Sequence, residues 1–139
     1  MTNQKILIIK NSWFHIVNDT ENAGEYFYQV LFELDPSLKS MFKNSDEEQS
    51  KKLVTMLSFV ISKLNVLNEI MPQIEGLAQR HTKYGVTADH YQTVGKALMQ
   101  MLEYKLGNYW NEEIKAAWLE VYTALSTAMI QSTPEVENV

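Results

Sequence analysis

The chain contains three histidines and no cysteine, so imidazole nitrogen is its best candidate for metal chemistry. His81 lies four residues after Leu77 and seven after Ile74, which places it on the apolar face of a predicted helix. His15 lies beside another apolar stripe and is predicted to be at the surface, and His90 lies just inside a predicted helix start. His81 is therefore the histidine whose position best suits a buried chemical role.

Two interpretations of His81 remain open on spacing alone. It is a core histidine whose ring nitrogens bond to neighbouring groups, or it is a metal ligand. No second histidine or carboxylate shares its helix face at ligand spacing, which argues against a zinc site. A single imidazole is sufficient for haem, because the porphyrin fills four positions of the iron and the protein supplies one axial histidine.

Other chemistries lack a motif. The chain has no glycine-rich phosphate loop, no His-Glu-x-x-His pair and no Gly-x-Ser-x-Gly elbow, and no inward-facing pair of carboxylates is evident. A formal net charge of -5 without a basic stripe disfavours nucleic acid as a partner. The apolar patch of residues 6–9 is too short for a signal-peptide core or a membrane span. We therefore expect a cytoplasmic protein without a membrane or nucleic-acid partner.

The elements that position His81 are predicted to be helices. Hydrophobic residues make up 45% of the 139-residue chain, and they recur at helical spacing rather than in alternation. The predicted class is an all-α single domain over residues 1–139 with about seven helices and a frayed tail over 132–139. The start signals are Asn22, Asp35, Ser45, Thr87 and Asn111, and Gly85 and Gly107 end two helices.

Several segments resemble bacterial globins, which include the haem domains of flavohaemoglobins and the single-domain bacterial haemoglobins. The resemblance covers nearly the whole chain, with the motifs in the family's order. Residues 27–32, Asp35-Pro36 and Met41-Phe42 match the B and C helices of the family, and residues 77–81 with Gly85-Val86 match the proximal F helix. Residues 90–95 match the start of the G helix, with Gln92 where proline is usual. Ala117-Trp118 and Val121-Tyr122 match the H helix.

The resemblance implies a globin fold around a pocket for haem b and assigns roles to single residues. His81 would be the proximal iron ligand, with its other ring nitrogen donating to a backbone carbonyl. Phe42 would wedge against the haem face. Tyr28 would be the distal tyrosine over the iron, and Gln49 the distal residue of helix E.

The resemblance also implies a lining for the pocket. Leu53 would lie over the distal side, and Lys52 and Arg80 would be partners of the haem propionates. Leu77, Val86, Tyr91 and Val94 would line the proximal and lower edges. Taken singly, Tyr28 and Phe42 also fit ordinary core positions and Gln49 fits the surface, so these alternatives stay open.

The predicted function is reversible binding of oxygen or another small gaseous ligand, for transport, storage or scavenging. The alternatives are a nitric oxide dioxygenase that works with a separate reductase, a sensor and a haem-free globin-like interaction module. Flavohaemoglobins carry a glutamate late in helix H, where this chain has Thr133, and Glu135 lies two residues beyond. No flavin or nicotinamide domain follows, so self-sufficient nitric oxide turnover is not expected. An oxygen-binding role is thus favoured over an enzymatic one.

Overall fold

The computed structural model describes residues 2–17, 23–42, 46–83 and 85–131. Within these residues the chain forms six α-helices and three short 3-10 helices, and no strand. The predicted all-α class is confirmed. The elements are α1 (Asn3–Val17), α2 (Ala23–Leu34), η1 (Pro36–Met41), α3 (Asp46–Ser62), η2 (Leu64–Ile70), α4 (Met71–Lys83), α5 (Ala88–Leu106), η3 (Gly107–Tyr109) and α6 (Glu112–Gln131).

Local capping chemistry sets several helix ends as predicted. Asp35 accepts a hydrogen bond from the backbone N–H of Ser37 at 3.1 Å, which starts η1. The Asn111 side chain accepts from the N–H of Ile114 at 2.8 Å at the start of α6. Gly85 follows α4 and Gly107 follows α5. Their φ values of 90° and 53° are ones that residues with a side chain rarely adopt.

Two details differ from the sequence prediction. Apolar residues at helical spacing predict that Leu64 ends one long helix and Ile70 begins the next. Both are buried, but both belong to η2. The cause is a kink at Val66, whose φ of -138° and ψ of 40° are not helical. The spacing of Ile6, Ile9, Trp13, Ile16 and Val17 predicts one buried face for α1, but Val17 is 41% exposed. The predicted starts at Asn22 and Ser45 and the tail over 132–139 lie outside the described residues.

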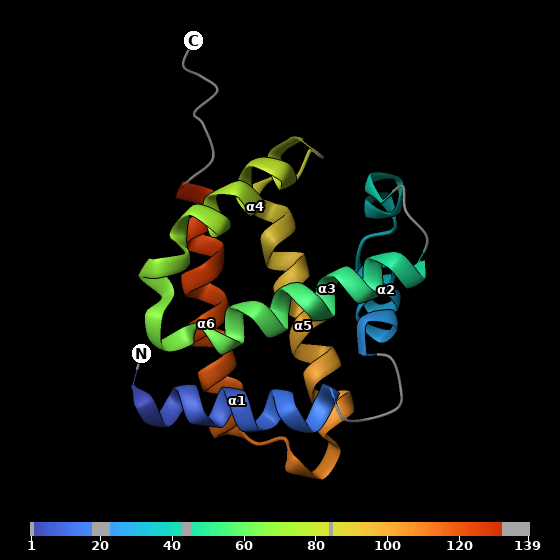
Figure 1. The fold of residues 1–139 in the computed structure, drawn as a ribbon. Helices are drawn as coiled ribbons and strands as arrows, with labels where there is room; N and C mark the ends of the chain where they lie inside the picture. Colours follow the sequence, from blue (N-terminus) through green and yellow to red (C-terminus); the bar gives the residue numbers. More distant parts are fainter. Residues whose placement is uncertain (1, 18–22, 43–45, 84, 132–139) are drawn as a thin grey trace.

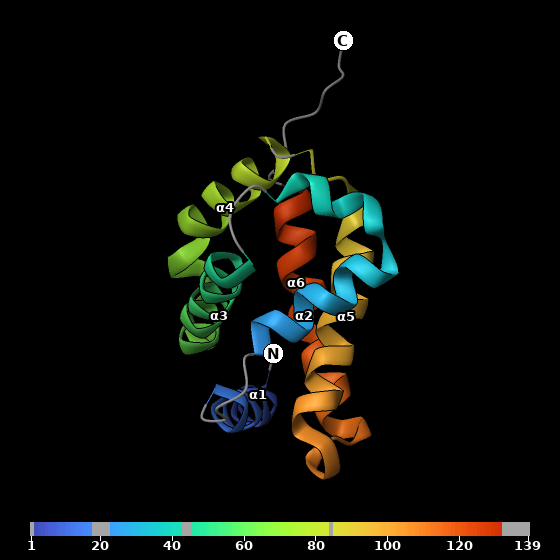
Figure 2. The same ribbon diagram turned by 90° about the vertical axis from the view of Figure 1, so that its right-hand side faces the viewer.

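The helices cross in two layers. In Figure 1, α1 and α3 run side by side across α5 and α6, and Figure 2 shows α1 nearly end-on against these two helices. Helix α2 packs on α3 and α5, and α4 packs on α6. This arrangement leaves α2, α3, α4 and the start of α5 around one end of the molecule.

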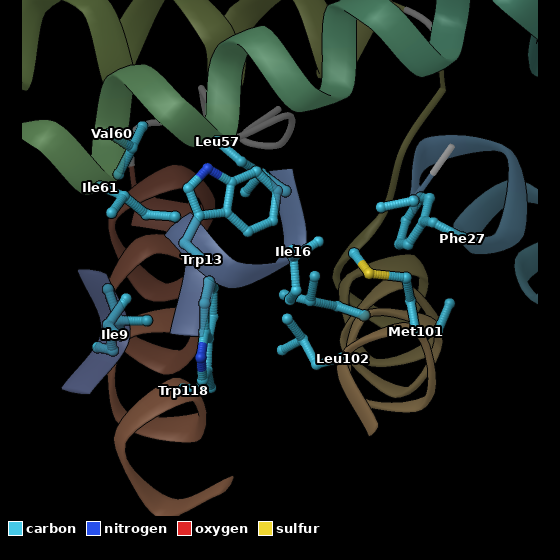
Figure 3. Packing of buried hydrophobic residues seen from close by; sticks show 14 of the residues in the cluster. Ile9, Trp13, Ile16, Phe27, Leu57, Val60, Ile61, Met101, Leu102 and Trp118 are labelled. Carbon is cyan, nitrogen blue, oxygen red and sulfur yellow. The ribbon is translucent and has the colours of Figure 1, made fainter. Parts of the chain in front are cut away.

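Two tryptophans join the layers. The Trp118 side chain of α6 is 1% exposed, and its ring centroid lies 6.0 Å from that of Trp13 in α1. Figure 3 shows the two indoles next to each other, tilted by 55°, with Trp13 nearer to the apolar side chains of α3. Trp13 Nε1 donates to Ser58 Oγ of α3 at 2.9 Å, so this cluster connects three helices.

The surface carries the charge. Lys51 and Lys52 are exposed, and Lys51 pairs with Glu47 at 3.4 Å one turn earlier. Lys5 pairs with Glu120 at 2.6 Å and joins α1 to α6 at a site where water screens the interaction.

No single helix among the described residues is long and apolar enough to cross a membrane. Only the bent pair Glu47–Ser62 and Leu64–Lys83, at 104°, passes the same test of length and composition.

We predict that Ser12→Ala lowers the free energy of unfolding by about 1–3 kcal/mol, because a buried donor loses its acceptor. Ser12 Oγ accepts from Trp118 Nε1 at 2.8 Å, and both residues are buried. Urea unfolding followed by circular dichroism measures the change. Ser62→Ala is the matched control, since the exposed Ser62 hydroxyl donates only to the Phe59 carbonyl at 2.7 Å. Equal losses in the two variants would contradict the role of the Trp118 hydrogen bond.

Candidate functional site

His81 lies in the last turns of α4, on the side of the helix that carries the buried Ile74 and Ala78. Its ring is half-buried, and Nδ1 lies 2.8 Å from the carbonyl oxygen of Leu77. Because a carbonyl only accepts, Nδ1 carries the proton and donates it, which leaves Nε2 with a lone pair. The hydrogen bond that was expected for the second ring nitrogen is therefore present.

Burial also favours the form of His81 that can bind a metal. Removal of the ring from water lowers the pKa of His81, and the nearby charge of Arg80 acts in the same direction. The bond to the Leu77 carbonyl opposes this shift without reversing it. The imidazole is thus neutral near pH 7, as metal ligation through Nε2 requires.

Tyr91 is the aromatic neighbour of His81 on this side. The two ring centroids lie 6.4 Å apart with planes inclined by 22°, and Tyr91 is buried. Tyr122 of α6 donates its hydroxyl to the Tyr91 carbonyl at 2.5 Å, which holds the first turn of α5 against α6. Gly95 makes room for this contact, since a Cβ there would lie 2.8 Å from the Tyr122 ring.

Tyr122 contributes to the site although it was singled out in the sequence only as part of a motif. Nothing in its spacing indicates a partner 31 positions earlier in the chain. Its role is structural, because its hydroxyl is used by a backbone carbonyl, and burial raises its pKa.

On the opposite side, Tyr28 of α2 lies in an aromatic cluster. Its ring centroid lies 5.3 Å from that of Phe42, at an angle of 71° that is typical of edge-to-face packing. Phe32 lies 5.9 Å from Tyr28 and 5.4 Å from Phe42. Phe32 was not among the predicted site residues, although it lies four residues after Tyr28 on the same helix face.

The Tyr28 hydroxyl is a protonated donor. Burial raises the pKa of Tyr28 to about 12, so the phenol keeps its proton over the physiological range. The described residues provide no hydrogen-bond partner for this hydroxyl, and desolvation is the sole cause of the shift. The donor is thus available to a group that is not part of these residues.

Helix α3 supplies the remaining residues of this side. Gln49 and Leu53 are half-buried and lie one turn apart, and Lys52 is exposed. The helix packs on α2, which carries Tyr28.

The two sides meet where α4 turns into α5. A Cβ on Gly85 would lie 3.9 Å from the terminal methyl carbon of Met41 at the end of η1, next to Phe42. In Figure 1 these elements surround the upper right part of the molecule, with α2, η1 and the start of α3 on one side and the end of α4 and the start of α5 on the other.

The predicted lining is less buried than the core. Tyr91 is buried, Arg80 is exposed, and the other apolar members are only partly buried against the core: Tyr28, Phe42, Leu53, Leu77, Val86 and Val94. In the described part of the chain, no three His, Asp or Glu side chains converge as metal ligands. A neutral imidazole with one free nitrogen beside half-buried apolar side chains fits a cofactor that brings its own metal and is itself largely apolar.

The Globin family model matches residues 25–129. The chain belongs to the globin family. The match includes every predicted site residue, and membership implies that this globin binds haem.

Similar proteins support the assignment. A Flavohemoprotein of Oceanobacillus iheyensis is 28% identical over 85% of this globin, which spans only 30% of that relative. An uncharacterized globin-like protein of Aquifex aeolicus is 32% identical, with 94% of this chain and 92% of that protein covered. The solved structure of a bacterial globin from Campylobacter jejuni superimposes with a TM-score of 0.83 at 25% identity, over 94% of this chain and 95% of the other.

We predict that His81→Ala loses most of its haem at neutral pH, because the substitution removes the nitrogen available to the iron. His15→Ala and His90→Ala should retain haem. His15 packs 4.5 Å from the Tyr109 ring, and His90 Nδ1 accepts from the Thr87 N–H at 3.0 Å, so both side chains are engaged elsewhere. The ratio of Soret to protein absorbance after gel filtration measures retention. Equal retention in the three variants would overturn the assignment of His81.

Proposed function

We propose that residues 1–139 form a single globin domain that binds haem b through Nε2 of His81 and reversibly binds oxygen on the side of Tyr28. The observation that carries the proposal is the pairing of a neutral imidazole, whose Nδ1 is held by the Leu77 carbonyl, with a protonated tyrosine hydroxyl that has no partner among the described residues. When bound, haem supplies an iron atom that takes a small gaseous ligand. The chain's own residues decide how tightly that ligand is held.

The distal side chains suit oxygen in particular. Bound dioxygen carries partial negative charge, and the Tyr28 hydroxyl and the Gln49 amide are both donors. A hydrogen bond to a charged acceptor contributes roughly 1.5–3 kcal/mol, which corresponds to about 10- to 150-fold in an equilibrium constant. None of the three histidines lies in α2, η1 or α3, so the distal donors are a phenol and an amide. We expect tight binding and slow release of oxygen.

The remaining side chains hold the cofactor. Leu53 and Phe42 are half-buried and would limit access of water to the bound ligand. Leu77, Val86, Tyr91 and Val94 would pack against the proximal and lower edges of the haem. Lys52 and Arg80 are exposed, and their long side chains would pair with the propionates at the edge of the pocket.

A second candidate function is nitric oxide dioxygenation with electrons from a separate reductase. The similarity to the Flavohemoprotein relative favours it. A haem-free interaction module is disfavoured, because such a module would not require a free Nε2 on a half-buried imidazole. We place the protein in the cytoplasm in either case.

We predict that Tyr28→Phe speeds oxygen dissociation by about 10-fold or more, because it removes a hydrogen bond to a charge-bearing ligand. Carbon monoxide carries much less charge, so its dissociation should change by less than about twofold, well below the factor of ten that equals 1.4 kcal/mol. Stopped-flow ligand replacement on the haem-loaded protein measures both rates. An oxygen rate within about twofold of wild type would exclude the distal role of Tyr28.

Gln49→Leu separates the two donors in the same assay. The variant should show the same preference for oxygen over carbon monoxide, more weakly if the amide mainly supports the phenol. The double variant with Tyr28→Phe should fall short of the sum of the single effects, because both donors act on one ligand. Strict additivity would show that the two side chains do not share a ligand.

The chain is predicted not to consume nitric oxide catalytically with NADH alone. Its five glycines are widely spaced and form no dinucleotide-binding loop, so no element of the chain is suited to accept hydride from NADH. A nitric oxide electrode measures turnover, with an added flavin reductase as the comparison. Turnover with NADH and no added protein would contradict this prediction, and turnover only with the reductase would favour the second candidate function.

A further inference from the structure

Helices α2 and α3 lie in close contact at Gly24 and Ser50. A Cβ on Gly24 would lie 2.8 Å from three atoms of Ser50, namely Cα, Cβ and the carbonyl oxygen. Both residues are buried, and the Ser50 side chain is fully so at 0% exposure. Two of the three atoms belong to the backbone, so rotation of a side chain cannot relieve the overlap. The spacing of the two helices therefore depends on the absence of a side chain at position 24.

The contact is steric rather than polar. The Ser50 hydroxyl is buried and has no hydrogen-bond partner in the described part of the chain. Nothing polar at this crossing compensates for a change in distance between the helices. The close packing of small residues is what holds α3 against α2 here.

The crossing lies next to both distal donors. Gly24 precedes Tyr28 by one helical turn, so the two residues share a stripe of α2. Ser50 directly follows Gln49 in α3, and Leu53 lies three residues further along. A shift of α3 relative to α2 at Ser50 therefore moves Gln49 relative to Tyr28 by a similar amount.

We propose that Gly24 is a positioning residue of the distal site, which sets the separation of α2 and α3 so that Tyr28 and Gln49 reach the same bound ligand. The inference rests on the proposed function of these two side chains. Two carbon atoms prefer a separation of about 3.5 Å or more, so a methyl group at position 24 displaces the helices by roughly 0.7 Å. A displacement of this size lengthens a donor–acceptor distance of about 2.9 Å to more than about 3.5 Å, the upper limit for a hydrogen bond.

The test is Gly24→Ala in the haem-loaded protein. We expect oxygen dissociation to become about 10-fold faster, with carbon monoxide dissociation changed by less than about twofold, because only the hydrogen-bonded ligand loses a donor. The matched control is Gly76→Ala in α4. A Cβ at Gly76 would meet only the Arg80 guanidinium at 3.5 Å, an ordinary contact, so both rates should stay at the wild-type value.

A second measurement separates positioning from mere destabilisation. The infrared C–O stretch of the carbon monoxide complex responds to donors beside the ligand, and Gly24→Ala should shift it in the same direction as Gln49→Leu. The double variant Gly24→Ala with Gln49→Leu should release oxygen little faster than Gln49→Leu alone, because both changes remove the same bond. Reduced stability or haem retention with an unchanged C–O stretch and unchanged oxygen rate would overturn the proposal.

If Gly24→Ala does not retain haem, the partner side of the crossing takes its place. Ser50→Thr enlarges the same contact and should speed oxygen release selectively, whereas Ser50→Ala keeps Cβ and should leave the rate within about twofold. Equal rates for wild type and both Ser50 variants would reject the proposal. If Tyr28→Phe speeds oxygen dissociation but the Gly24 and Ser50 variants do not, only the role of Gly24 is rejected. If Tyr28→Phe leaves oxygen dissociation unchanged, the distal function itself is rejected.

Discussion

The buried indole of Trp118 is a centre on which helices α6, α1 and, through Trp13, α3 meet. It lies in the contact between α6 and α1, away from water, and its N–H therefore needs a partner, which Ser12 provides. Trp13 packs against it and reaches Ser58, so α3 is held to the same centre. Helix α6 in turn presents Tyr122 to the start of α5. Because Tyr91 is the ring neighbour of His81, helix α6 links this buried centre to the surroundings of His81.

The structure divides its apolar side chains into two populations. Those between the α1–α3 layer and the α5–α6 layer are buried against one another. Those around His81 and Tyr28 are only partly buried. When a ligand covers apolar surface that was in contact with water, the free energy of binding becomes more favourable by about 25 cal/mol for each Å² covered. A flat apolar cofactor is the kind of molecule that would recover this free energy, and the free nitrogen of His81 would fix its orientation.

Two tyrosines show how surroundings assign different roles to one residue type. Burial raises the pKa of both Tyr28 and Tyr122, so both remain protonated. The Tyr122 hydroxyl donates to a backbone carbonyl and holds two helices together. Tyr28 lies among aromatic rings, with no acceptor for its hydroxyl in the described residues. The presence or absence of an internal acceptor is what makes one tyrosine structural and leaves the other available to a ligand.

The sequence by itself determined the helices, several of their ends and the inward position of His81. Each of these depends on residues within a turn or two of the chain: the carboxylate of Asp35 caps the next turn, and Gly85 ends α4 because it tolerates a positive φ. The order of the motifs indicated the family. Tertiary structure alone decided the kink at Val66, the hydrogen bond from Tyr122 to Tyr91 and the crossing of Gly24 with Ser50. These contacts join residues far apart in the chain or arise from packing against other helices, and no local pattern of residue types encodes them.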